Sequence, residues 1–175
     1  MRTLIVLGVI CLGAELLLAV GGTYQPLNVK TGLWETTWTS SLSGRPPIPA
    51  NMVESLTPEQ RERFEAAMNK MVSQAPKTRT AKSCLTEEKL KKDPFNEENK
   101  SCTETILASS GSRMDIREVC SGGAVKNDVT VHIEAIDSEH VSAKVVSNMS
   151  GGGNTMNMNG TFTSKWLGAA CGDTK

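Results

Sequence analysis

The chain has 175 residues, of which 38% are hydrophobic and 22% charged, and its 19 basic and 19 acidic residues leave a formal net charge of zero at pH 7. A balanced charge provides no long-range field that would attract nucleic acid or an anionic membrane surface, so we expect no nucleic-acid partner. The length suits a single domain.

The N-terminal residues are typical of an export signal. Arg2 gives a positive start, residues 4–20 are apolar apart from two glycines and Glu15, and small residues surround the expected cleavage position. The pattern predicts a cleaved signal peptide over residues 1–22. Retention as an uncleaved anchor stays open, because the apolar run is near the ~17–20 residues that span a bilayer. We therefore expect an exported protein with a mature domain of residues 23–175 and no transmembrane segment after cleavage.

Strand and turn signals open the mature chain. Residues 33–39 are rich in aromatic and β-branched side chains and predict a strand. The prolines within residues 43–49 remove backbone donors and fix φ, so this stretch is predicted to be a linker or lid. Together with the helix that follows, residues 43–76 form an insertion after the first strand.

That helix has a strong start signal. Thr57 is a suitable N-cap, Pro58 occupies the first helical position, and Gln60 completes a capping box. Apolar residues then recur at helical spacing, which predicts one amphipathic helix over residues 58–74. A second, short helix is predicted over residues 86–91, where acidic residues complement the first turn.

The C-terminal half predicts a meander of antiparallel strands. Apolar and polar residues alternate there with a period of two, and turn signals come about every ten residues. Further strands are predicted near residues 78–84, 101–108, 113–120, 127–136, 140–149 and 155–166. The fold class is therefore mainly β, with about seven antiparallel strands in a strongly curved sheet or open barrel (calycin-like). We expect the long helix to close one end or to lie in the concavity, and barrel closure stays open.

Four of the five cysteines follow the export signal, namely Cys84, Cys102, Cys120 and Cys171. An even number of cysteines in an exported chain predicts two disulfides. A hairpin of the two strands about Gly111 would place Cys102 across from Cys120, at the Cβ separation of ~4.5–5.5 Å that a disulfide can bridge. Cys84 is then left to pair with Cys171. A turn shifted by one residue would break the first assignment.

Two metal sites are conceivable, and each has a simpler interpretation. Met149, Met156 and Met158 have a spacing that suits Cu(I), although methionines at period two are commonly core residues. His132 and His140 would lie nearly opposite each other across a turn, but we expect both to be surface residues. No structural zinc spacing occurs among the cysteines. We therefore predict no metal and no cofactor.

Catalytic signals are weak. The chain has no Gly-x-Ser-x-Gly elbow and only two histidines, and nothing singles out Asp115 or Glu134 as a catalytic carboxylate. We therefore expect a non-catalytic protein.

Two classes of function then remain. The first is a carrier of a small apolar molecule or lipid, held inside the curved sheet and covered by the long helix. Its candidate ligand-binding residues are Phe64, Met68, Met71, Trp34 and Trp38. The alternative is an interaction or structural module of the cell envelope, which would bind a protein partner through residues 43–53 or an exposed strand edge.

Short motifs in a fixed order resemble the bacterial domain of unknown function 3617 family. They are Gly32-Leu33-Trp34-Glu35, Thr57-Pro58-Glu59-Gln60-Arg61, Cys84-Leu85-Thr86, Cys102-Thr103, Arg113-Met114-Asp115 before Cys120, and Trp166-Leu167-Gly168 before Cys171. One departure is Thr31, where the family pattern would have proline. The resemblance implies a single exported bacterial domain that is periplasmic or secreted, and it brings no activity, cofactor or catalytic residue to carry over.

Overall fold

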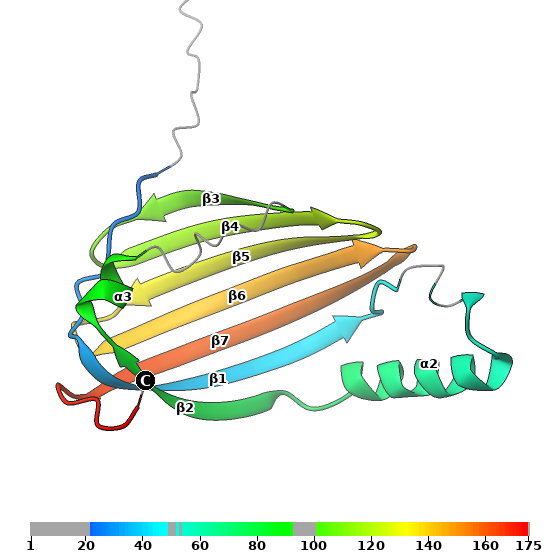
Figure 1. The fold of residues 1–175 in the computed structure, drawn as a ribbon, viewed down its shortest axis with the longest axis horizontal. Coiled ribbons are helices and arrows are strands. Elements are labelled where there is room, and N and C mark those ends of the chain that lie inside the picture. The colour runs from blue at the N-terminus through cyan, green and yellow to red at the C-terminus, as the bar shows by residue number, and fades with distance from the viewer. Residues whose placement is uncertain (1–21, 49–51, 53, 93–100, 175) are drawn as a thin grey trace, which may run out of the picture.

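The computed structural model describes residues 22–48, 52, 54–92 and 101–174. Within these ranges, one seven-stranded antiparallel sheet dominates (Figure 1). The strands are β1 (Gly32–Gly44), β2 (Lys77–Leu85), β3 (Cys102–Ser109), β4 (Arg113–Gly122), β5 (Val125–Ala135), β6 (His140–Gly151) and β7 (Asn154–Gly168). The mainly β fold with seven antiparallel strands is confirmed. Almost all of the predicted signal peptide, residues 1–21, lies outside the described residues.

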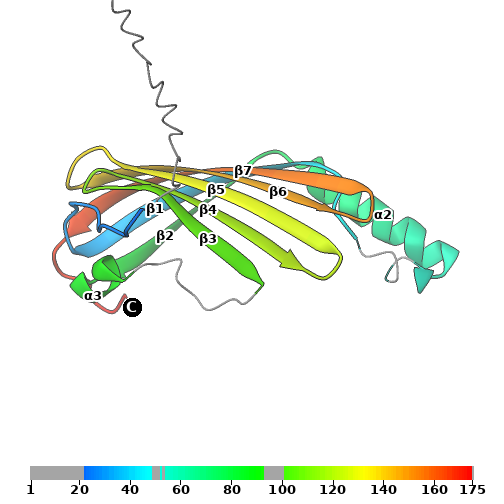
Figure 2. The ribbon, with the colours of Figure 1, turned by 90° about the horizontal axis from the view of Figure 1, so that it is seen from above.

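The strand order is β2-β1-β7-β6-β5-β4-β3. Strands β3 to β7 form a meander, and β1 lies between β7 and β2. The sheet has two free edges, β2 and β3, so it is open and not a closed barrel. Figure 2 shows its strong curvature, with the edge strands bent toward the side on which helix α3 lies.

The two faces of the sheet differ in polarity. The concave face carries most of the core, because apolar residues alternate inward from neighbouring strands. Its buried members are Trp34, Met114, Ile116, Ala143, Val145 and Met156. The convex face is polar, with hydroxyl pairs such as Thr39–Thr78 (2.9 Å between the Oγ1 atoms) and the bidentate Arg117–Asp128 ion pair (3.0 and 2.6 Å).

Helix α2 (Pro58–Val72) is inserted between β1 and β2. Thr57 caps it in the predicted capping box with Gln60. Of the two expected positions, closing one end of the sheet or lying in the concavity, α2 does not take the second. It extends beyond the end of the sheet near the ends of β1 and β7, and none of its residues is buried (Figures 1 and 2).

Two disulfides are present, Cys102–Cys120, the pair expected from the hairpin register, and Cys84–Cys171, the pair that was left. The first joins β3 to β4, and the second attaches the end of β2 to the C-terminal segment. Cys102 and Cys120 are direct partners in that register, and the adjacent Ser121 N donates to Ser101 O (2.8 Å), so the bridge occupies a non-hydrogen-bonded position. Within the described ranges, no helix combines the length and apolarity needed to cross a bilayer.

Candidate functional site

A cavity of about 260 Å³ lies at one end of the concave face. Its floor comes from the sheet, and its cover comes from residues 22–31 and helix α3 (Glu87–Lys91). The lining is mainly apolar. It consists of Tyr24, Leu27, Val29, Trp34, Thr36, Ser83, Leu85, Lys89, Leu90, Met114, Ile133, Val141 and Ser164. Apolar pockets with a few polar groups are the usual sites for small ligands, and drug-sized ligands take ~300–1,000 Å³. This cavity therefore suits a small molecule or part of one hydrocarbon chain of a lipid.

Hydrogen bonds to loops of the sheet hold the covering segment in place. The Tyr24 hydroxyl donates to Leu90 O (2.7 Å), which links this segment to α3. The backbone N of Asn28 donates to Gly111 O (2.6 Å), and the backbone N of Lys30 donates to Ser138 O (2.9 Å). Residues 22–31 are therefore attached to two strand turns and to helix α3.

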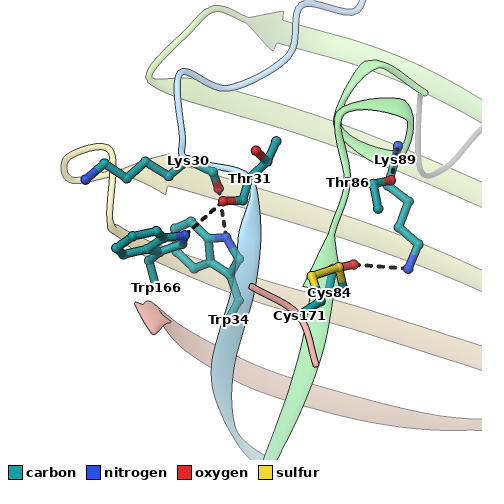
Figure 3. The surroundings of a disulfide bond; sticks show 8 residues. All are labelled: Lys30, Thr31, Trp34, Cys84, Thr86, Lys89, Trp166 and Cys171. Carbon is teal, nitrogen blue, oxygen red and sulfur yellow. Dashed lines mark hydrogen bonds between the residues drawn. A yellow bond between two sulfur atoms is a disulfide. The ribbon is translucent and has the colours of Figure 1, made fainter. Parts of the chain in front are cut away.

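Helix α3 begins shortly after Cys84, which the disulfide with Cys171 joins to the C-terminal segment. Thr86 caps the helix by accepting from Lys89 N (3.2 Å), and Lys89 Nζ donates to Cys84 O (3.1 Å) (Figure 3). Lys89 is thus a cation beside the cavity whose ammonium group already has a backbone partner.

An open apolar surface continues from the cavity across the concave face. Trp38 and Phe162 are direct partners on β1 and β7, and their ring centroids are 3.8 Å apart. The Trp38 ring lies over Gly160, where an added Cβ would come within 2.8 Å of the indole. Together with Val129 and Val131 of β5, these aromatic residues are only half-buried. This part of the sheet exposes apolar side chains that no described helix covers.

The structure divides the predicted ligand-binding residues among different places. Trp34 lines the cavity, and Trp38 lies on the open part of the concave face. Phe64 and Met68 instead line a separate hollow of about 360 Å³, between α2, Pro46 and the β6–β7 turn. Met71 lines neither space. The helix residues and the two tryptophans therefore do not form one site.

The methionines predicted as a copper alternative do share a face. Met149 and Met156 are direct partners on β6 and β7, and Met158 is two residues farther along β7. Met156 is only 8% exposed and belongs to the core. This placement fits the interpretation of core residues.

The two histidines are not opposite each other. His132 faces Lys144, and His140 lies at the turn, where Ile136 N donates to His140 O (2.9 Å). The prediction that the two histidines lie nearly opposite each other was wrong, because the turn is centred farther along the chain than expected.

A charged cluster that sequence reasoning did not single out lies on the convex face. Asp115 accepts hydrogen bonds from His132 Nδ1 and from Arg113 Nε (2.8 Å). Burial by itself would raise the pKa of the Asp115 carboxyl, but the hydrogen bonds from His132 and Arg113 outweigh it and hold the pKa below the ordinary value of 3.8. The β4–β5 register places Asp115 directly opposite His132, so the short turn after Gly122 was the signal that could have revealed this pair.

Cys102, Glu118 and Cys120 are close enough to hold a metal ion together. The sulfur atoms of Cys102 and Cys120 are joined in a disulfide, however, so neither cysteine offers a thiolate ligand.

Comparison with protein families gives a match over residues 29–171 to the family described as "Protein of unknown function (DUF3617)". Neither the curated proteins nor the solved structures give a match. The matched range contains strands β1 to β7, helices α2 and α3, and the four cysteines of the disulfides in the described part of the chain. The chain therefore belongs to the DUF3617 family of proteins of unknown function.

Proposed function

We propose that the protein is an exported, non-catalytic carrier that binds a small apolar molecule or lipid on the concave face. The observation that carries this proposal is the apolar cavity under residues 22–31 and its continuation into half-exposed apolar residues of the same sheet face. A sheet normally covers its apolar face with another layer. A bound ligand would supply that layer here.

Export to an oxidising compartment, the periplasm or the extracellular space, belongs to the same proposal. It is supported by the N-terminal signal pattern and by the two disulfides.

The test is a titration with N-phenyl-1-naphthylamine, a neutral apolar fluorophore. We expect saturable binding and enhanced fluorescence. Val141→Phe would fill part of the cavity and should weaken binding roughly tenfold or more, the scale on which apolar pockets respond to a change in volume. Val146→Phe is the matched control, because Val146 is on the same strand but on the convex face and is 41% exposed. Absence of binding to the wild type, or equal weakening by both variants, would contradict the proposal.

A second candidate function is binding of an envelope protein partner. It is favoured by the hollow of about 360 Å³ beside α2, where Pro46, Ile48 and Phe64 lie among charged residues of both signs. Mixed apolar and charged surfaces of this kind are common at protein interfaces. Native mass spectrometry of protein from an envelope extract should then show a stoichiometric partner that Phe64→Ser removes. Co-purification of a small molecule instead would favour the carrier.

A further inference from the structure

The concave face carries unlike charges at its two edges. Strand β2 contributes Lys77 and Arg79, which are the register partners of Ser40 and Trp38 and so share their face. At the other edge, Glu104 of β3 faces Glu118 of β4. Apolar side chains occupy the strands between these edges.

Register links the basic edge to the cavity. From β2 across the sheet, the successive partners in one row are Arg79, Trp38, Phe162, Ala143, Ile133 and Met114. The last two line the cavity. The adjoining row begins at Lys77 and passes Ser40 and Gly160 to Val145 and Val131. A continuous apolar path therefore leads from Arg79, beside Lys77, to the cavity.

These two cations differ from the third one on the same strand in the face they occupy. Lys82 is on the convex face, where its register partner is Glu35, a carboxylate that accepts from Lys165 Nζ (2.9 Å). Lys77 and Arg79 are exposed, and among the described residues neither side chain has a hydrogen bond or ion pair. Their positive charge is available to an anion.

We propose that the ligand is a single-chain anionic amphiphile, a long-chain fatty acid anion. Its carboxylate would bind Lys77 and Arg79, and its chain would cross Trp38 and Phe162 toward the cavity. This inference rests on the proposed carrier function and adds the class of ligand. A guanidinium group presents paired donors that match a carboxylate, and an adjacent ammonium adds charge. The small volume of the cavity favours a ligand with one hydrocarbon chain over a ligand with two.

The experiment compares oleate with oleyl alcohol, which has the same chain but no charge. Both are measured by displacement of N-phenyl-1-naphthylamine at concentrations below oleate aggregation. We expect the wild type to prefer oleate roughly fivefold to tenfold, the scale of one or two exposed ion pairs. The preference should decrease with added salt.

Three variants locate the head group. In the Lys77→Gln/Arg79→Gln double variant, the affinity for oleate should fall to the affinity for oleyl alcohol. The affinity for oleyl alcohol should stay unchanged. Lys82→Gln removes one charge from the opposite face and should keep the preference. Lys89→Gln tests the cation beside the cavity, and it should also keep the preference because Lys89 already has a backbone partner.

The possible outcomes separate this inference from the proposed function. Equal binding of oleate and alcohol to the wild type would overturn the anionic ligand and leave the apolar carrier. Loss of the preference in Lys89→Gln, but not in the double variant, would overturn the placement at the β2 edge. Binding of neither ligand, together with no binding of the fluorophore, would overturn both proposals.

Discussion

Trp34 and Trp166 are direct partners on β1 and β7, and their indole N–H groups donate to the carbonyl oxygens of consecutive residues. Trp34 Nε1 donates to Lys30 O (2.9 Å), and Trp166 Nε1 donates to Thr31 O (3.0 Å) (Figure 3). The Lys30 ammonium also lies 4.6 Å from the centroid of a Trp166 ring. The sheet thus holds the point at which the covering segment enters β1.

Gly32 makes this arrangement possible, and its replacement is the first prediction. It has φ +128°, and an added Cβ would collide with the carbonyl oxygen of Gly168. Gly32→Ala should therefore lower the free energy of unfolding by about 1–3 kcal/mol or more, as for other strained backbone positions. Urea denaturation followed by tryptophan fluorescence measures this change.

Gly168→Ala is the control for Gly32→Ala. Gly168 is at the end of β7 and is the register partner of Leu33, the residue after Gly32. An added Cβ at Gly168 would meet no atom within 4 Å. Its replacement should change stability by only a few tenths of a kcal/mol. Equal destabilisation by the two substitutions would contradict the collision at Gly32.

The second prediction concerns the unequal contributions of the disulfides. Cys84 and Cys171 are 87 positions apart in the sequence, and Cys102 and Cys120 are 18 apart. On the loop-entropy account, the long-range bond contributes about 4.6 kcal/mol and the hairpin bond about 3 kcal/mol. The Cys84→Ala/Cys171→Ala protein should therefore unfold at a lower urea concentration than the Cys102→Ala/Cys120→Ala protein. The reverse order would show that the hairpin bond contributes more than loop closure.

The alternation of side chains explains why the strands were predictable. A sheet with one polar face repeats every two residues, and residues 127–149 follow this pattern closely enough to define β5 and β6. Short turns then set the register, so the facing position of Cys102 and Cys120 could be worked out from the turn near Gly111.

The site was less predictable because its parts lack such periodicity. Residues 22–31, which cover the cavity, form no regular element, and hydrogen bonds to distant turns hold them. The pairing of β1 with β2 spans the whole α2 insertion, so no turn signals it. The capping box of α2 predicted the helix itself, but a cap carries no information about the surface against which a helix lies.

The third prediction tests the core beneath the open face. Ile116 is 1% exposed at the centre of β4, whereas Leu107 on the edge strand β3 is 56% exposed. Ile116→Ala should cost about 2–5 kcal/mol of stability through lost burial and the cavity left behind. Leu107→Ala should cost less than about 1 kcal/mol. Chemical denaturation of both variants measures the difference, and similar values would contradict the assignment of the core to the concave face.

The last prediction concerns stability at acid pH. The folded-state pKa of Asp115 is below the ordinary value of 3.8, because hydrogen bonds from His132 and Arg113 outweigh the opposing effect of burial. A depressed carboxyl pKa stabilises the folded state above the ordinary value, and this contribution is lost as pH falls through the folded pKa. The wild type should therefore lose stability as pH falls below about 4, on the linkage relation for a paired aspartate.

Asp115→Asn removes the titrating group and separates its contribution from those of other carboxyl groups. The variant should be less stable than the wild type at pH 7 by about 1.5–3 kcal/mol, the range for hydrogen bonds that involve charged groups. The difference should shrink as the pH falls toward 2. Asp173→Asn is a suitable control, because Asp173 is exposed near the C-terminus, and among the described residues its carboxyl has no hydrogen bond or ion pair. A difference between Asp115→Asn and the wild type that stays constant from pH 7 to pH 2 would show that Asp115 stabilises the sheet through its shape and not through its charge.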